Sequence, residues 1–194
     1  MQKLMGVQKM ITIRKYEEKD RENLLKICIE TSSLPTEDKK DLDFLNLMYN
    51  DYYAAVEGYN CFVAADDNDE AVGYILCAEN FDRYYKTFKA LYLPHIRKLG
   101  FKYYTMALGE IAVHSLYRKK YPAHLHIDIL PVCQGKGTGT ALVNELKDHL
   151  KSKGIDNVML SCGMGNQKAI KFYKKNDFKM IANIAGSCIM VSEF

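Results

Sequence analysis

A glycine-rich stretch at residues 134–140, which reads QGKGTGT, has the composition of a phosphate-binding turn. Glycine adopts positive φ at little cost and lets the backbone approach a ligand closely. If a helix follows the turn, its first N–H groups lack partners inside the helix, and its dipole adds partial positive charge there. The run from Gly135 to Thr140 therefore predicts an anion-binding nest, most simply for a pyrophosphate, to which Lys136 adds a point charge.

The residues on both sides supply the elements that such a turn needs. Before it, Leu125, Ile127 and Ile129 alternate with polar residues, which is the period of a strand. Pro131 then ends the strand, because it has no N–H to donate. After the turn, apolar residues recur at helical spacing, at Ala141, Leu142, Leu146 and Leu150.

Several interpretations of this turn compete. A P-loop needs Ser or Thr after its lysine, but Gly137 follows Lys136. A Rossmann fingerprint needs Gly or Ala at its third position, where Thr140 stands. A plain connecting turn also stays open. The pattern Q/R-x-x-G-x-G/A after a strand is matched in full by Gln134, Gly137 and Gly139, and it resembles the coenzyme A site of the GCN5-related N-acetyltransferases (GNAT).

A second block downstream extends this resemblance. Residues 157–162 (NVMLSC) have the pattern of a short apolar strand, and Asn166 is a good N-cap for a helix over 167–175. The block resembles the family pattern N-x-x-A-x-x-F/L-Y-x-x-x-G-F, which is matched at Asn166, Ala169, Phe172, Tyr173 and Phe178. Asp177 replaces the usual glycine. Because Asp tolerates left-handed backbone better than most residues, we expect the helix to stop there all the same.

The resemblance implies the fold and the coenzyme. It implies one α/β domain with a mixed, mostly antiparallel sheet that splays between its fourth and fifth strands, with helices on both faces. The co-substrate would be acetyl-CoA, with its pantetheine arm in the splay and no metal. The implied coenzyme-binding residues are Ile129, Leu130, Gln134, Gly135, Lys136, Gly137, Thr138, Gly139, Thr140, Asn166, Ala169 and Tyr173. An oxyanion donor would be a backbone N–H at the splayed end of the fourth strand.

The catalytic roles are assigned less directly. The resemblance makes Tyr173 the general acid near the sulfur, with simple packing as the alternative. Acetyl transfer also needs a group that removes the proton of the amine. Asp128 is our chosen base, on a strand face that it shares with His124 and His126. His126, Glu110 and a water relay stay open, and Ser161 stands where some family members carry a glutamate.

The first half of the chain fits the same architecture. We expect a strand at residues 10–14, a helix capped by Asp20, a helix over 41–53, and a hairpin from 60–65 and 71–78. Residues 81–122 form an aromatic and basic insertion with two expected helices, interrupted at the Leu93-Pro94 break. This insertion is either structural packing or a lid or wall of the acceptor pocket. A last strand is expected at 186–191.

A weaker resemblance raises the question of activity. Residues 121–128 (YPAHLHID) are similar to those of bacterial relatives of the acetyltransferase-like C-terminal domain of O-GlcNAc hydrolases. Some domains of that kind are not catalytic, so a sensor or pseudo-enzyme that holds acetyl-CoA without turnover is the alternative function. The intact glycine turn favours bound acetyl-CoA.

Composition sets the remaining expectations. The 194 residues suit one domain, residues 1–194, and a net charge of +3 makes no strong case for nucleic acid or a membrane surface. No apolar run is long enough for a bilayer span, and six scattered cysteines without C-x-x-C favour reduced thiols in a cytoplasmic protein. We therefore predict an acetyl-CoA-dependent N-acetyltransferase with an unidentified primary amine of a small molecule or peptide as acceptor. A homodimer through the exposed end of the last strand is possible.

Overall fold

A seven-stranded mixed sheet forms the centre of the protein. The computed structural model describes residues 11–34 and 36–194, and its strands follow the order β1-β2-β3-β4-β5-β7-β6. The strands are β1 (Thr12–Lys15), β2 (Phe62–Ala65), β3 (Ala71–Ala78), β4 (His124–Ile129), β5 (Asn157–Gly163), β6 (Lys179–Ile184) and β7 (Ser187–Glu193). Every neighbouring pair is antiparallel except β4 and β5, which are parallel.

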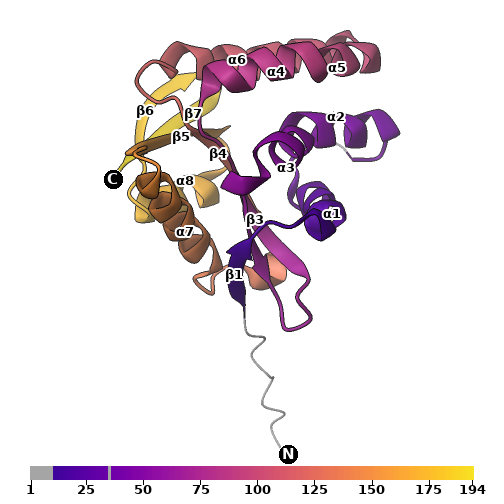
Figure 1. Ribbon diagram of the computed structural model, residues 1–194. Helices are drawn as coiled ribbons and strands as arrows, with labels where there is room; N and C mark the ends of the chain where they lie inside the picture. The colour runs from indigo at the N-terminus through magenta and orange to yellow at the C-terminus, as the bar shows by residue number, and fades with distance from the viewer. Residues whose placement is uncertain (1–10, 35) are drawn as a thin grey trace, which may run out of the picture.

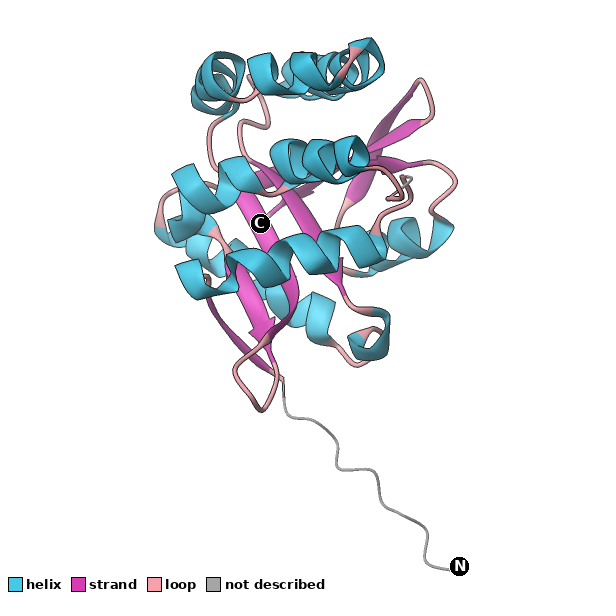
Figure 2. Ribbon diagram, turned by 90° about the vertical axis from the view of Figure 1, so that its right-hand side faces the viewer, coloured by secondary structure: helices cyan, strands magenta, loops and turns pink. Residues whose placement is uncertain are grey.

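Helices cover both faces of this sheet, as expected. They are α1 (Arg21–Thr31), α2 (Lys39–Tyr49), α3 (Asp51–Glu57), α4 (Phe81–Leu91), α5 (Leu93–Leu99), α6 (Phe101–Tyr117), α7 (Thr138–Ser152) and α8 (Gln167–Lys175). Figure 1 shows α7 and α8 on the left of the sheet, α1 to α3 on the right, and α4 to α6 as a layer above. Figure 2 looks onto the side that α1 to α3 cover.

The two larger apolar cores follow from this layering. Helices α1 to α6 bury aromatic residues such as Tyr52 and Phe88 with Tyr74 of β3. On the other face, Leu142 and Leu146 of α7 pack with Leu125 of β4. The strand alternation thus directs Leu125 to the α7 side and leaves the intervening β4 side chains on the α1–α6 side.

The splay between β4 and β5 is confirmed. A single Cα pair, His124↔Met159, joins the two strands, and the Met159 N–H donates to the Ala123 carbonyl at 2.9 Å. Beyond this pair the strands separate, and β4 stays attached only to β3. The opening therefore lies beside the carboxyl-terminal half of β4.

Three local expectations need correction. The predicted helix 41–53 is two helices, α2 and α3, because Asn50 between them has non-helical backbone angles (φ −125°, ψ −60°). The Asp20 side chain does not cap α1; its carboxylate accepts hydrogen bonds from Arg14. Strand β1 begins at Thr12, and Met10 lies outside the described residues.

The last strand is not at the edge of the sheet. β7 pairs with β5 on one side and β6 on the other, so its hydrogen-bonding edges are occupied and β6 is the edge strand. A homodimer through the exposed end of the last strand stays a prediction, since β6 pairs with β7 only as far as Val191. Within the described part of the chain, no helix has the length and apolarity to cross a bilayer.

Candidate active site

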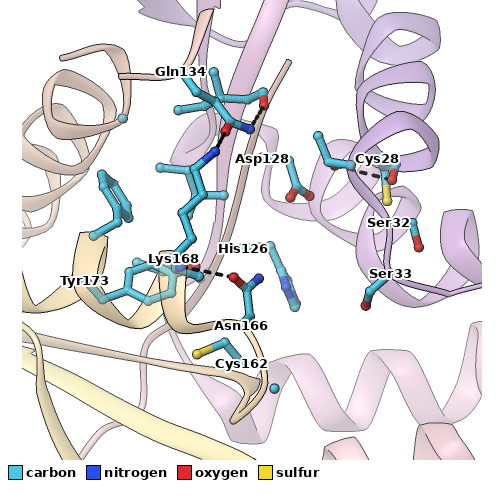
Figure 3. Close-up of a pocket in the computed structure, with 18 of the residues that line it drawn as sticks. Cys28, Ser32, Ser33, His126, Asp128, Gln134, Cys162, Asn166, Lys168 and Tyr173 are labelled. Atoms are coloured by element: carbon cyan, nitrogen blue, oxygen red, sulfur yellow. Dashed lines mark hydrogen bonds between the residues drawn. The ribbon is translucent and has the colours of Figure 1, made fainter. Parts of the chain in front are cut away.

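A cavity of about 640 Å³ opens at the splay between β4 and β5. Its lining comes from β4, β5, the start of α7, α8 and the connection between α1 and α2. In Figure 3 the Asp128 side chain points into this space from β4. Cys28, Ser32 and Ser33 lie on one side of it, and Tyr173, Asn166 and Lys168 on the other. The cavity thus joins the predicted coenzyme residues to the predicted base.

The glycine turn has the conformation of an anion-binding nest. Gly135 (φ 76°) and Gly137 (φ 87°) both adopt left-handed backbone, which few other residues tolerate. Helix α7 begins at Thr138, so its first free N–H groups face the turn. The Gln134 side-chain amide donates to the Ile129 carbonyl at 2.8 Å, which ties the turn to β4. The turn is therefore preformed at the mouth of the splay.

Gly139 is required for a different reason, which is close packing. A Cβ built on Gly139 would stand 2.8 Å from the Phe172 ring and 3.0 Å from Ile129 Cδ1. Real Cβ atoms do not approach other atoms so closely. The second glycine of the pattern thus lets α7 approach α8 and β4 beside the cavity.

Helix α8 supplies the opposite wall of the cavity. The Asn166 side chain accepts a hydrogen bond from the Ala169 N–H at 3.0 Å, which confirms its N-cap role. Asp177 ends the helix with φ 65°, as expected for its left-handed position. The Lys168 ammonium group donates to the Gln134 side-chain oxygen and so spans the cavity from α8 to the glycine turn (Figure 3).

Tyr173 packs on α8 with its ring against Phe172 and Phe178, at centroid distances of 5.3 and 5.7 Å. It is 8% exposed and lines the cavity. Burial, and then the negative charge of Asp128, raise the pKa of its phenol well above the usual range. Tyr173 therefore holds its proton throughout the neutral range, as a hydrogen-bond donor must.

Asp128 has the environment of a general base. Burial raises the pKa of its carboxyl to about 6, while hydrogen bonds from Tyr74 and Thr31 act in the opposite direction. The Tyr74 hydroxyl donates to Asp128 Oδ2 at 2.6 Å. A carboxylate with this pKa is ionised at neutral pH and is a stronger proton acceptor than an ordinary aspartate.

The histidines on the same strand are poorer candidates. His126 lines the cavity, with its ring 5.1 Å from that of Tyr49, and burial lowers its pKa to about 3. His124 does not line the cavity, and burial lowers its pKa well below the usual range. Both imidazoles hold protons too weakly to remove one from an amine near neutral pH.

The remaining predicted coenzyme residues divide into two groups. Ile129, Gln134, Gly135, Gly137, Gly139, Thr140, Asn166, Ala169 and Tyr173 all line the cavity. Leu130, Lys136 and Thr138 do not. Leu130 packs toward the α1–α6 core, Lys136 is exposed, and the buried Thr138 hydroxyl donates to the Cys133 carbonyl at 3.3 Å.

The connection between α1 and α2 is the wall that sequence reasoning missed. Cys28, Thr31, Ser32, Ser33 and Leu34 line the cavity there, together with Tyr49 of α2. The sequence predicts only a helix end and a polar loop for these residues, and they match no ligand-binding motif. Their position depends on how α1 and α2 pack over the sheet.

The aromatic segment 81–122 supports the cavity without lining it. All of its residues are described, and none of them is among the lining residues. Tyr84, Phe88 and Ile96 are buried in the core instead. The segment forms three helices where two were expected, because α5 follows α4 after a break at Tyr92, and Leu93 and Pro94 begin α5 rather than interrupt the chain. One side chain of the segment reaches the cavity wall: Glu110 of α6 accepts a hydrogen bond from the Ser161 hydroxyl of β5.

Comparisons with known proteins give one consistent family. The model of the acetyltransferase (GNAT) family matches residues 24–178. An uncharacterised N-acetyltransferase of Methanocaldococcus jannaschii is 31% identical over 160 residues, which cover 71% of each chain. The second resemblance, to relatives of O-GlcNAc hydrolases, stays a prediction.

Solved structures share the fold over nearly the whole chain. The crystal structure of SsHAT has a TM-score of 0.84 at 26% identity, covering 94% of this chain and 98% of that one. The N-acetyltransferase PaiA of Thermoplasma acidophilum, solved in complex with coenzyme A, has a TM-score of 0.63 at 18% identity, covering 95% and 99%.

Proposed function

Because the chain belongs to the acetyltransferase (GNAT) family, we propose that it transfers the acetyl group of acetyl-CoA directly to a primary amine of a small molecule or peptide. The observation that carries this proposal is the continuity of the site. One cavity runs from the left-handed glycines of the turn to the carboxyl group of Asp128. The glycine turn at one part of the cavity suits the phosphates of an acyl carrier, and the proton acceptor at another part suits an amine.

The residues present fit coenzyme A. Gly135 and Gly137 leave open space where a side chain would stand, since a Cβ on either would meet nothing within 4 Å. The N-terminus of α7 and this cradle would hold the pyrophosphate. The Asn166 amide would hold the pantetheine arm with its NH₂ group, because its oxygen already caps α8. The thioester would lie in the splay between β4 and β5.

Asp128 and Tyr173 then have complementary roles. Asp128 accepts the proton that the amine loses as its nitrogen attacks the thioester carbonyl and the C–N bond forms. A backbone N–H at the end of β4 would stabilise the oxyanion. Tyr173 donates a hydrogen bond to the sulfur as the C–S bond breaks, and the products are an amide and the coenzyme A thiolate. The thiolate takes a proton from solvent, and Asp128 releases to solvent the proton that it took from the amine. Burial disfavours a phenolate at Tyr173, which favours hydrogen bonding over complete proton release.

The alternative function is a module that binds acetyl-CoA without turnover. Both functions require the glycine turn, but only the enzyme requires Asp128 beside the thioester. The buried Asp128 carboxyl group favours the enzyme, because its hydrogen bonds do not offset the effect of burial on its pKa, and burying an ionisable group at a binding site without a catalytic use costs stability.

The first test is calorimetric titration of the purified protein with acetyl-CoA. Gly137→Glu should abolish binding, since the new carboxylate would occupy the phosphate nest. Gly154→Glu is the matched control: Gly154 also has positive φ (74°) and open space, but it lies outside the cavity. Equal binding by both variants, or no binding by the folded wild type, would overturn the proposal.

A second measurement separates the enzyme from the sensor. Release of free coenzyme A thiol is followed in the presence of a panel of primary amines, with Asp128→Asn alongside. Thiol release that depends on the amine and falls in the variant supports catalysis. Tight acetyl-CoA binding without amine-dependent release supports the sensor.

A further inference from the structure

Glu110 and Asp128 approach the cavity from opposite sides of the splay. In the parallel pair His124↔Met159, the next residues on the same face are His126 of β4 and Ser161 of β5. Ser161 therefore lies across the opening from His126, which precedes Asp128 by two residues on the same face of β4. Helix α6 packs over this part of β5, because its Val113 is buried with Met159. This packing places Glu110, one turn earlier on α6, at Ser161.

The negative charge of Glu110 acts inside the cavity. Glu110 accepts a hydrogen bond from the Ser161 hydroxyl, and both Ser161 and Tyr49 line the cavity. Burial first, then the charge of Glu110 and that of Asp128, raise the pKa of Tyr49 well above its usual range. The exposed face of Tyr49 thus lies in the field of both carboxylates.

No lysine or arginine in the described part of the chain balances this charge. Among the described residues, no lysine or arginine forms an ion pair with Glu110 or Asp128. The nearest basic group to Glu110 is His114, whose Nδ1 lies 3.6 Å from Glu110 Oε1. His114 Nδ1 also lies 3.0 Å from the Glu110 carbonyl oxygen, and its buried Nε2 has no partner.

Acetyl transfer uses only one of the two carboxylates, Asp128. Glu110 is therefore free to bind a second positive charge on the acceptor. The reacting amine must be neutral when it attacks, so it gives its proton up and cannot remain the counter-ion of a carboxylate. Asp128 accepts the proton that the amine gives up. Glu110, which has no lysine or arginine partner among the described residues, suits a positive charge that persists through the reaction, and the Tyr49 ring would add a cation–π contact.

We propose that Glu110 is an acceptor-binding residue, and that the preferred acceptor is a primary amine with a second positive charge, which Glu110 and Ser161 hold while the first amine reacts. This inference rests on the proposed function, since it names the acceptor class of the same site. It assigns α6 a direct role in substrate choice, although α6 contributes no residue to the cavity lining.

The test compares matched amines. Straight-chain α,ω-diaminoalkanes from propane to hexane are compared with n-alkylamines of the same length, as acceptors and as ligands of the protein saturated with coenzyme A. The variants are wild type, Glu110→Gln and, as control, Glu145→Gln on the exposed surface of α7. Glu110→Gln keeps an acceptor for the Ser161 hydroxyl and removes only the charge, so the fold should be retained.

In the wild type and the control, the best diamine should exceed its monoamine by about tenfold or more in kcat/KM and in affinity. Glu110→Gln should reduce this ratio to near one by raising KM of the diamine, whereas Glu145→Gln should keep the wild-type ratio. Equal monoamine and diamine affinity in the wild type, or a ratio that survives Glu110→Gln, would overturn the inference. If no amine is acetylated, the proposed function fails, while calorimetric binding to the coenzyme A complex still decides the role of Glu110.

Discussion

Tyr74 and Asp128 are direct partners across the antiparallel β3–β4 pair, and the Tyr74 hydroxyl donates to Asp128 Oδ2 at 2.6 Å. Tyr74 is fully buried, so this hydrogen bond is shielded from solvent. It stabilises the ionised carboxylate and opposes the effect of burial, which raises the pKa of Asp128 to about 6. The proposed base is thus tuned by a neighbour that touches no substrate.

Tyr74→Phe should move the acid limb of the pH–rate profile to higher pH. Loss of a hydrogen bond to a charged group raises the carboxyl pKa by about 1 unit, because such bonds contribute about 1.5–3 kcal/mol and one unit is about 1.4 kcal/mol. The measurement is kcat against pH with both substrates saturating. Wild-type kcat should fall below about pH 6, where Asp128 becomes protonated.

Tyr103→Phe is the matched control for Tyr74→Phe. The Tyr103 hydroxyl donates to Asp41 at 2.8 Å, in a buried pair that does not line the cavity. It should lower stability without moving the pH profile. If both variants leave the acid limb in place, Asp128 is not the group that titrates there.

Asp128→Asn should stabilise the folded protein at neutral pH while it removes the base. The carboxyl pKa is about 6 in the folded state and about 3.9 in the unfolded chain, so folding favours the protonated form. Below about pH 4 the carboxyl group is protonated in both states and does not lower the free energy of unfolding. The destabilisation grows between about pH 4 and 6 and is constant at higher pH. Asparagine should therefore raise the free energy of unfolding by about 1–3 kcal/mol at pH 7.5. Chemical denaturation at pH 4 and 7.5 checks this, since the gain should shrink at the lower pH.

The parts of the site that the sequence predicted are those that depend on local structure. Gly137 adopts left-handed backbone, Asn166 caps α8, and Asp177 ends it with positive φ, because each depends on a few adjacent residues. The splay was expected from the resemblance and is seen in the single β4–β5 pair. Local chemistry of this kind can be read from one stretch of chain.

The contacts that the sequence could not predict join distant segments. Tyr74 lies in an apolar strand with no polar pattern, and its bond to Asp128 depends on the β3–β4 register. Glu110 reaches Ser161 only because α6 crosses β5. The break at Asn50 is hidden because the apolar pattern continues through it. Each depends on tertiary packing that local patterns do not encode.

Gly139→Ala should weaken acetyl-CoA binding by displacing α8. The added Cβ would meet the Phe172 ring at 2.8 Å, so the ring and the part of α8 that carries it must shift at the edge of the cavity. Overpacking of this kind costs about 1–3 kcal/mol. We expect a lower melting temperature and an affinity for acetyl-CoA reduced by about tenfold, measured by thermal unfolding and calorimetry.

Gly109→Ala provides the matched control, because Gly109 is also helical but has nothing within 4 Å of an added Cβ. It should stabilise α6 by about 0.5–1 kcal/mol through helix propensity and leave acetyl-CoA binding unchanged. Equal effects of the two alanines would mean that Gly139 serves only the helix and not the approach of α8.

Tyr173→Phe tests whether the phenol acts on the leaving sulfur or only fills space. The ring packs against Phe172 and Phe178, and phenylalanine keeps those contacts, so stability and acetyl-CoA affinity should change little. Without the hydroxyl, the departing thiolate would form in a buried site with no donor. We therefore expect kcat to fall by about 100-fold, within the usual range for general acid–base groups. Tyr121→Phe, which loses hydrogen bonds to Glu193 and Lys120 outside the cavity, should keep wild-type kcat. A Tyr173→Phe enzyme with unchanged kcat would make Tyr173 a packing residue and leave protonation of the thiolate to solvent.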